Sequence, residues 1–375
     1  MKHTSINLFS LVILTFLMSC NFEQNKEKMK NEASEKQFQE IVLKNSNGTK
    51  VSIINYGATV TSIIVKDKNG NLGEIVLGYD KPEDYPEGNP YFGATIGRFG
   101  NRIAKGKFTL GSNEYQLELN NEPNHLHGGN IGFNNVFWEI IDFQDTGKNQ
   151  FVSLKYISKD MEEGYPGNLT INLTYTLTEE NELVIDYKAT TDKSTVLNLT
   201  HHSFFNLSNG GKSKILDHEL TVYADSFIPV DSTLIPTGEI RTVENTPFDF
   251  RKGKKIGADI EADNIQIKYG RGFDHTFVIN GNEGSLKLAA SVYDPMSGRK
   301  MELYTTEPGM QLYTGNFLDG SDIGHNSTPY QFRAAFCLEP QHFPDSPNQD
   351  NFPSTVLSPG EVYTQKSVFR FSVEE

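Results

Sequence analysis

Two adjacent histidines, His201 and His202, are the residues of this chain whose surroundings are best suited to chemistry. They lie in residues 196–207 (VLNLTHHSFFNL), a segment whose apolar and aromatic content predicts a strand. Side chains alternate across a strand, so His201 shares a face with leucines, whereas His202 shares the other face with hydroxyl, amide and aromatic groups. We therefore predict that His202 transfers protons and that His201 packs. The alternative for His202 is a neutral histidine that is hydrogen-bonded inside the fold.

Glu339 is the corresponding carboxylate, in the strand-like segment 335–344. Alternation places it on the face opposite Phe336 and Leu338. A carboxylate between apolar neighbours must be hydrogen-bonded or paired, because burying a free charge is costly. Glu339 is therefore a candidate general base. The alternative is a glutamate that pairs with an arginine to close the sheet.

Other polar side chains gather in short clusters that contain glycine. The clusters are residues 93–106, 124–129, 272–277 and 308–316. In the first, glycines let the backbone approach whatever Asn101 and Arg102 contact, although glycine-rich turns with arginine are also common structural features. In the second, His125 and His127 would face the same way on a strand, which suits a metal ion as well as a sugar. In the third, Asp274 is a candidate ligand, although an aspartate there also serves as a turn or cap.

Strand patterns dominate the elements that must position these residues. We predict strands at 51–56, 59–65, 74–78, 169–177, 182–189, 286–293 and 301–306. Turn-forming clusters such as 67–71 and 280–284 separate them. No stretch of ten or more residues keeps an apolar stripe at helical spacing. The sequence thus predicts an all-β fold, a large antiparallel β-sandwich, with ligand groups at strand ends and on long connections such as 119–135.

The first 19 residues predict export. A short basic start precedes an apolar run from Ile6 to Met18, which is too short to span a bilayer. Its end, LMSC at 17–20, resembles the lipobox of bacterial lipoproteins, in which the cysteine is lipidated. We predict a signal peptide over 1–19, a lipidated Cys20, a polar tether over 20–37 and a domain over 38–375, anchored in the cell envelope and facing the periplasm or the exterior. The alternative is a secretory signal with an incidental cysteine.

Charge and cysteine content exclude several classes of protein. The formal net charge is −14, and it becomes −15 when Lys2, the only charged residue of 1–19, is removed. A chain this acidic is not expected to bind nucleic acid. Of the two cysteines, lipidation would consume Cys20, and Cys337 alone forms neither a disulfide framework nor a thiolate metal site.

Taken in order, eight phrases of the sequence resemble those of the aldose 1-epimerase (galactose mutarotase) family. They are GRFGNRIAKG (97–106), LHGG with a following GF (126–133), NLTHHSFFNL (198–207), PVDSTLIPTG (229–238), FDFR (248–251), GFDH (272–275), PGMQLYTGN (308–316) and CLE (337–339). The resemblance runs from about residue 51 to about residue 371. It implies a β-supersandwich that interconverts the α- and β-anomers of free hexoses such as galactose and glucose.

The resemblance also implies roles for individual residues. His202 matches the family's general acid and Glu339 its general base. The positions that hold sugar hydroxyls, or lie beside the acid, are matched by Asn101, Arg102, His127, Asp274, Gln311, Ser203 and Phe204. Two departures matter, because His201 stands where asparagine is common and Phe204 where tyrosine is common. Loss of that phenol removes one hydrogen bond to the sugar and leaves the preferred aldose open. His125 has no assigned role.

The implied chemistry needs one acid and one base. Opening the hemiacetal removes the proton of the anomeric hydroxyl and protonates the ring oxygen, and the aldehyde then turns and closes from its other face. Glutamate and histidine, with ordinary pKa values of about 4.3 and 6.5, can be brought toward neutral pH by a partly desolvated cleft. No redox, phosphoryl or covalent step occurs, so we expect neither a cofactor nor a metal ion.

Three other interpretations stay open at the level of sequence. A sugar-binding lipoprotein without activity would not need both His202 and Glu339. A metal-dependent enzyme would use His125 and His127 with a carboxylate and a third histidine. A phosphosugar epimerase would need a cluster of cations to hold the phosphate, and the matched phrases offer Arg98 and Arg102 but no basic patch.

Overall fold

The computed structural model describes residues 37–88, 90–282 and 284–374. Contacts divide the chain into Met1–Gln39 and a compact unit, Glu40–Glu375. The predicted signal peptide, Cys20 and nearly all of the tether lie outside the described residues, so those expectations stay predictions. Within the described residues, no helix is long and apolar enough to cross a membrane.

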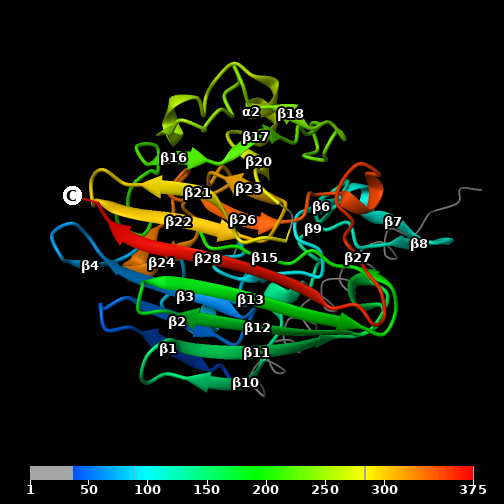
Figure 1. Ribbon diagram of the computed structural model, residues 1–375, viewed down its shortest axis with the longest axis horizontal. Coiled ribbons are helices and arrows are strands. Elements are labelled where there is room, and N and C mark those ends of the chain that lie inside the picture. Colours follow the sequence, from blue (N-terminus) through cyan, green and yellow to red (C-terminus); the bar gives the residue numbers. More distant parts are fainter. Residues whose placement is uncertain (1–36, 89, 283, 375) are drawn as a thin grey trace, which may run out of the picture. The chain divides into compact units, whose positions relative to one another are not determined.

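A nine-stranded antiparallel sheet forms the largest layer of the unit (Figure 1). In spatial order its strands are β10 (Glu139–Gln144), β11 (Gln150–Ser158), β12 (Leu169–Leu177), β13 (Glu182–Thr191), β28 (Tyr363–Val373), β22 (Arg299–Thr305), β21 (Lys287–Tyr293), β16 (Glu219–Val222) and β19 (Lys254–Lys255). Every second residue of β12 is buried, as expected for a strand with one face on the core. The last strand of the chain, β28, lies between β13 and β22.

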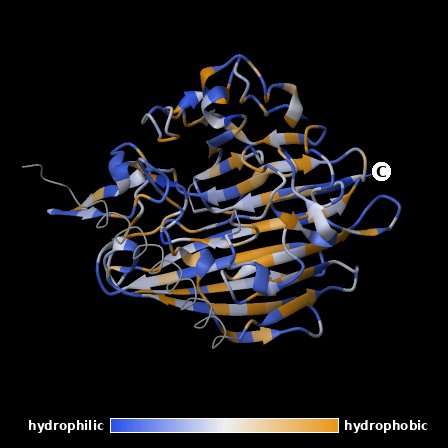
Figure 2. Ribbon diagram, turned by 180° about the vertical axis from the view of Figure 1, so that it is seen from behind, coloured by the Kyte–Doolittle hydropathy of each residue, from blue (hydrophilic) through white to orange (hydrophobic). Residues whose placement is uncertain are grey.

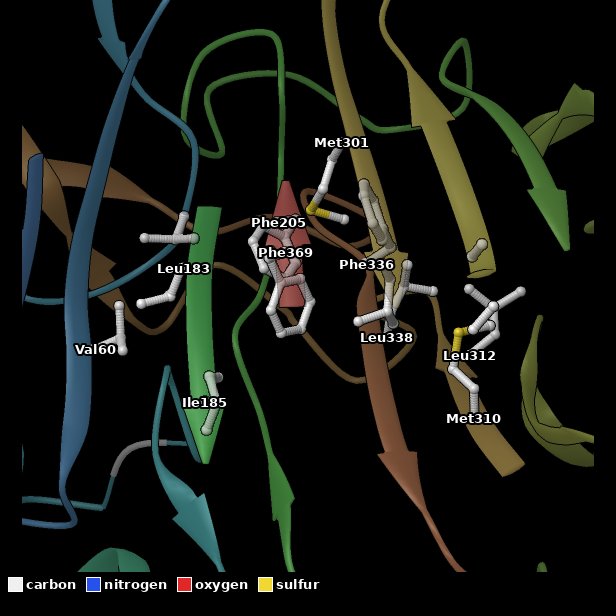
Figure 3. Packing of buried hydrophobic residues seen from close by; sticks show 14 of the residues in the cluster. Val60, Leu183, Ile185, Phe205, Met301, Met310, Leu312, Phe336, Leu338 and Phe369 are labelled. Atoms are coloured by element: carbon white, nitrogen blue, oxygen red, sulfur yellow. The ribbon is translucent and has the colours of Figure 1, made fainter. Parts of the chain in front are cut away.

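Two smaller sheets share a core with the nine-stranded sheet. The four-stranded sheet contains β1 (Glu40–Lys44), β2 (Lys50–Ile54), β3 (Thr59–Lys66) and β4 (Leu72–Glu74), and the five-stranded sheet contains β18 (Arg241–Thr242), β17 (Ala224–Phe227), β20 (Asp274–Ile279), β23 (Gly309–Tyr313) and β26 (Cys337–Gln341). Buried residues of all three sheets form one hydrophobic cluster. Figure 3 shows part of it, from Val60 on β3 through Leu183 and Phe369 to Leu312 and Leu338. Hydrophobic residues accordingly concentrate on the strands in Figure 2.

Short strand pairs join these sheets. They are β5 (Thr95–Ile96) with β15 (Thr200–His201), β6 (Arg102–Ile103) with β9 (His125–Leu126), β7 (Lys107–Leu110) with β8 (Asn113–Gln116), β14 (Thr195–Val196) with β27 (Val356–Leu357), and β24 (Ile323–Gly324) with β25 (Thr328–Pro329). Single 3₁₀ turns occur at Pro82–Asp84, Ala104–Gly106, Phe133–Asn135, Glu162–Gly164, Ile256–Ala258, His325–Ser327 and Ser346–Asn348. The α-helix α2 (Ile265–Gly270) is six residues long, too short to produce a helical stripe in the sequence.

The all-β sandwich prediction is confirmed, and most of the predicted strands are present. The strand predicted over 169–177 coincides with β12, whereas the one predicted over 74–78 is wrong beyond Glu74, where β4 ends. The predicted strand 196–207 is broken into β14 and β15. Its backbone changes partner every few residues, because Leu197 bonds to Thr355 and Phe205 bonds to Phe336. The segment therefore crosses between sheets instead of following one neighbour.

Candidate active site

His202 is held by its backbone immediately after β15. Its N–H donates to the carbonyl of Ala94 at 3.0 Å, and its own carbonyl accepts the N–H of Gly93 at 3.0 Å. The residue is 5% exposed, and its Nε2 lies 3.6 Å from Oε1 of Glu339. The ring of Phe204 lies 5.1 Å away and is tilted by 31°, so the imidazole is flanked by an aromatic surface.

His201 points the other way, into the core. Its ring makes edge contacts with Tyr175 and Phe369, and its Nε2 lies 2.7 Å from Oγ of Ser203. The predicted separation of the two histidines onto opposite faces is thus confirmed. The hydroxyl of Ser203 lies on the His201 side, and its expected contact with a sugar stays a prediction.

Glu339 lies in the middle of β26, directly opposite Gln311 on β23. It is 2% exposed, and its Oε2 has no hydrogen-bond partner among the described residues. Its neighbours Phe336 and Leu338 belong to the hydrophobic cluster, as strand alternation predicts. Cys337, on the same face as Glu339, places its Sγ 3.6 Å from Nδ1 of His202. The carboxylate therefore faces His202 from a strand that is fixed on its opposite side by the core.

Burial moves the two pKa values in opposite directions. It raises the pKa of Glu339 well above its usual value, an effect that the negative charge of Asp274 increases and the positive charge of Arg102 opposes. It lowers the pKa of His202 to about 4, because a buried imidazolium loses its hydration. We expected both pKa values to move toward neutral pH. The pKa of Glu339 shifts in that direction, whereas the pKa of His202 moves away from it.

Asn101 and His127 are joined by reciprocal hydrogen bonds. The N–H of His127 donates to the Asn101 carbonyl at 3.0 Å, and the N–H of Asn101 donates to Nδ1 of His127 at 3.1 Å. Both residues have positive φ values, 63° and 51°, which turn the backbone beside the β6–β9 pair so that these contacts can form. The His127 ring lies 5.3 Å from that of His202 at 84°. These two hydrogen bonds join segments 97–106 and 124–129, so that their polar side chains lie close together.

Asp274 and Gln311 form the opposite side of the site. Nε2 of Gln311 donates to Oδ1 of Asp274 at 2.6 Å, and Oγ1 of Thr276 donates to Oε1 of Gln311 at 2.5 Å. Burial raises the pKa of Asp274, and the Arg102 guanidinium and the Gln311 bond oppose that rise. Arg102 influences Asp274, Glu339 and His127 electrostatically, so its charge is central to the site.

Three ligand atoms, one each from His127, His202 and Glu339, lie within 4.8 Å of one another and could surround a metal ion. The hydrogen bonding of His127 does not fit that use. Its Nδ1 accepts the N–H of Asn101, and burial keeps its pKa well below 6.5, so the proton of the neutral ring is on Nε2. A metal-ligating histidine has the reverse arrangement, in which the second ring nitrogen donates. His127 is therefore set up as a hydrogen-bond donor.

Two residues that the metal and phosphate interpretations also used, His125 and Arg98, are occupied elsewhere. Nδ1 of His125 lies 2.7 Å from the carbonyl of Glu118, and its Nε2 lies 2.6 Å from the hydroxyl of Tyr165, so this ring is a packing residue. The guanidinium of Arg98 is buried and donates to the carbonyls of Pro166 and Gly167. Neither side chain is free to bind a ligand beside His202.

Two aromatic residues of the site were not found from the sequence. The Tyr91 ring lies 4.7 Å from that of His127 and 5.7 Å from that of His202. Tyr313 shares the face of Gln311 on β23, pairs with Asp274, and has its ring 5.8 Å from that of Phe204. Strand alternation from Gln311 could have identified Tyr313. Tyr91 lies in a loop, where no periodic signal exists.

The arrangement suits proton transfer between two oxygens that are close together on one molecule. A carboxyl and an imidazole 3.6 Å apart can reach two oxygens attached to the same carbon. Polar groups of Arg102, Asp274 and Gln311 lie near Glu339, and such donors and acceptors match a polyhydroxylated ligand.

Comparisons with known proteins identify relatives of this chain. The model of the aldose 1-epimerase family matches residues 39–370. The galactose mutarotase of Mus musculus is 47% identical over 330 residues, which cover 88% of this chain and 92% of that protein. The aldose 1-epimerase of Escherichia coli (strain K12) is 35% identical over 89% of this chain and 95% of that protein. A crystal structure of an aldose epimerase homologue from C. elegans superposes with a TM-score of 0.82 at 31% identity, covering 90% of this chain and 100% of that one.

Proposed function

This chain belongs to the aldose 1-epimerase family and has aldose mutarotase function, and we propose that His202 and Glu339 are the acid and base that open and close the sugar ring. The observation that carries the proposal is the separation of 3.6 Å between their side chains inside one buried site. The hydroxyl-bearing carbon of a cyclic aldose also carries the ring oxygen, so a pair this close can serve both oxygens at once.

The proposed reaction moves one proton at each oxygen. The Glu339 carboxylate takes the proton of the anomeric hydroxyl, the electron pair of that O–H bond forms the carbonyl, and the bond from the anomeric carbon to the ring oxygen breaks. The His202 imidazolium protonates the ring oxygen as it leaves. Rotation exposes the other face of the aldehyde, and closure reverses both transfers. The pair holds one proton throughout the cycle.

Burial shifts the single proton of the pair toward Glu339. The cyclic sugar is bound with the charged pair, whereas the open aldehyde is bound with protonated Glu339 and neutral His202. Burial favours the neutral pair, which is the direction of both pKa shifts. The charge of Arg102 acts against this, since it stabilises the Glu339 carboxylate that must be present at the start. The charged pair is therefore the minor form of the singly protonated site, and ring opening converts it into the favoured neutral pair.

We propose that galactose is a substrate, since relatives with 45% to 47% identity are named galactose mutarotases. We include glucose because the family resemblance of the sequence implies free hexoses of both kinds. Asn101, Arg102, His127, Asp274 and Gln311 would hold the sugar hydroxyls. In support, His127 presents an Nε2–H donor, and the Asp274–Gln311 pair presents a buried carboxylate next to an amide.

We also propose that the protein acts at the cell envelope, held by a lipid on Cys20. The support is the apolar run before Cys20 and the polar tether after it. Lipid chains add about 0.8 kcal/mol of membrane affinity per buried methylene, so two or three acyl chains would hold the protein firmly.

Polarimetry tests the proposed function. Freshly dissolved α-galactose and α-glucose should reach anomeric equilibrium faster with purified protein than without it. A chelator should leave the rate unchanged, because carboxyl and imidazole carry both proton transfers. Equilibration at the spontaneous rate for every aldose tried would refute the function. If the purified protein holds a stoichiometric metal ion and its removal abolishes activity, the acid–base assignment is refuted.

A further inference from the structure

Tyr91 contacts both histidines of the site although it lies outside every strand. Its ring meets that of His127 edge-on, at 4.7 Å and 62°. It also lies 5.7 Å from the ring of His202 at a tilt of 35°, an arrangement similar to that of Phe204 on the same imidazole. His202 therefore lies between the rings of Tyr91, Phe204 and His127, and Tyr91 is the one that carries a hydroxyl.

The loop that carries Tyr91 is fixed to His202 and to the core. Ala94 donates to the Tyr91 carbonyl at 3.2 Å, and Ala94 and Gly93 make the two backbone bonds to His202. Phe92 is fully buried, with its ring 5.0 Å from that of Phe204. Tyr91 itself has a φ of 71°, a conformation that a bulky residue adopts only when its surroundings enforce it. The backbone of this loop therefore holds the Tyr91 ring in its position beside His202.

The Tyr91 ring lies beside both histidines, and it brings a hydroxyl to this part of the molecule. Among the described residues, none makes a hydrogen bond to it. Burial raises the pKa of Tyr91 and the charge of Arg102 opposes the rise, so the phenol is neutral at neutral pH and lies within the field of Arg102. A neutral phenol both donates and accepts, which matches a sugar hydroxyl.

We propose that Tyr91 is a substrate-binding residue whose hydroxyl hydrogen-bonds a hydroxyl of the bound aldose. It supplies, from a different segment, a phenol in a site where position 204 is phenylalanine. This inference rests on the proposed function, because the ligand is the aldose that His202 and Glu339 act on.

The test compares Tyr91→Phe with wild type and with Tyr223→Phe, a control on an exposed tyrosine. One lost hydrogen bond to a neutral partner should weaken galactose binding and raise KM by roughly 2- to 10-fold, with kcat nearly unchanged. Both constants come from polarimetry, and calorimetry gives the affinity independently of turnover. Tyr223→Phe should match wild type in both.

Galactose analogues that each lack one hydroxyl identify the partner. For the analogue without the hydroxyl that Tyr91 contacts, wild type and Tyr91→Phe should bind equally, whereas the other analogues should keep the difference. Unchanged galactose affinity in Tyr91→Phe, or an equal loss for every analogue, would overturn the inference and leave the proposed function intact. Failure of wild type to accelerate mutarotation would instead refute the proposed function, and calorimetry would still decide whether Tyr91 contacts the sugar.

Discussion

Glu339 and His202 have separate tasks in the proposed mechanism, so replacing either should slow turnover strongly. Glu339→Gln and His202→Asn keep approximate shape but remove a proton-transfer partner, and each should lower kcat by roughly 100-fold or more. Galactose affinity, measured by calorimetry, should change much less.

Variants of two neighbouring residues should affect KM, in contrast to the loss of kcat expected for Glu339→Gln and His202→Asn. Asp274→Asn and Gln311→Ala should act partly through KM, because these side chains would contact hydroxyls in ground and transition states alike. The assignment fails if a substitution of His201 abolishes kcat while His202→Asn retains it.

The opposed pKa shifts predict a bell-shaped dependence of kcat/KM on pH. As pH falls through about 4, His202 and Glu339 both become protonated and no base remains. As pH rises through the raised pKa of Glu339, the pair loses its single proton and no acid remains. Initial rates after brief exposure to each pH would measure both limbs. In Glu339→Gln the alkaline limb should disappear from the residual activity, and its persistence would assign that limb to another group.

The low pKa of His201 should make the stability of the protein, and not its turnover rate, depend on pH. Burial lowers its pKa to about 3 in the folded protein, against about 6.5 when unfolded, so the unfolded state takes up a proton first as pH falls. Between about pH 7 and about pH 5, wild type should lose roughly 2 kcal/mol more unfolding free energy than His201→Asn. Urea denaturation measures this difference.

A matched control separates titration from the loss of a contact at His201. Ser203→Ala removes the hydrogen bond of His201 without removing its titration, so it should keep the wild-type pH dependence. The turnover of His201→Asn should stay within a few-fold of wild type. Parallel stability profiles for wild type and His201→Asn would contradict the prediction.

At the level of elements, the loop 91–94 and the segment around His202 depend on one glycine. A Cβ at Gly93 (φ 63°) would lie 1.9 Å from the carbonyl oxygen of Val60, so alanine must displace this loop. Gly111 has a similar φ of 60° with nothing within 4 Å, which makes Gly111→Ala the matched control. We expect Gly111→Ala to cost about 1 to 2 kcal/mol of unfolding free energy from backbone strain alone.

Gly93→Ala should cost at least about 2 kcal/mol more, because it also disturbs the backbone bonds to Val60 and His202. It should lower kcat as well, since those bonds place His202. Urea midpoints and polarimetry compare the two variants. If Gly93→Ala and Gly111→Ala change stability and kcat equally, the loop 91–94 does not hold His202 in position.

Strand alternation predicts the elements of the site well where one face of a strand is buried. It correctly separated His201 from His202 and placed Glu339 opposite Phe336 and Leu338, because both pairs of faces are fixed by the core. It could not show that segment 196–207 is broken, since the partners of that segment are far apart in the sequence. It could not find Tyr91 either, because a loop position is set by tertiary contacts.

At the scale of the whole molecule, the location of the protein depends on residues outside the compact unit. Cys20→Ser should release the protein from membranes into the soluble fraction, because it removes the proposed site of lipidation. Cys337→Ser is the matched control and should sediment with membranes as wild type does. Sedimentation of Cys20→Ser with membranes would show that the lipobox interpretation is wrong.

The position of β28 constrains when the protein can fold. This last strand, residues Tyr363–Val373, fills the middle of the nine-stranded sheet between β13 and β22 (Figure 1). Without it, the edges of β13 and β22 that face each other are unpaired, and Phe369 and Phe371 are missing from the shared core. A chain proposed to be exported would therefore stay unfolded during synthesis, which keeps it competent for translocation, and mutarotase activity would arise only after it has crossed the membrane.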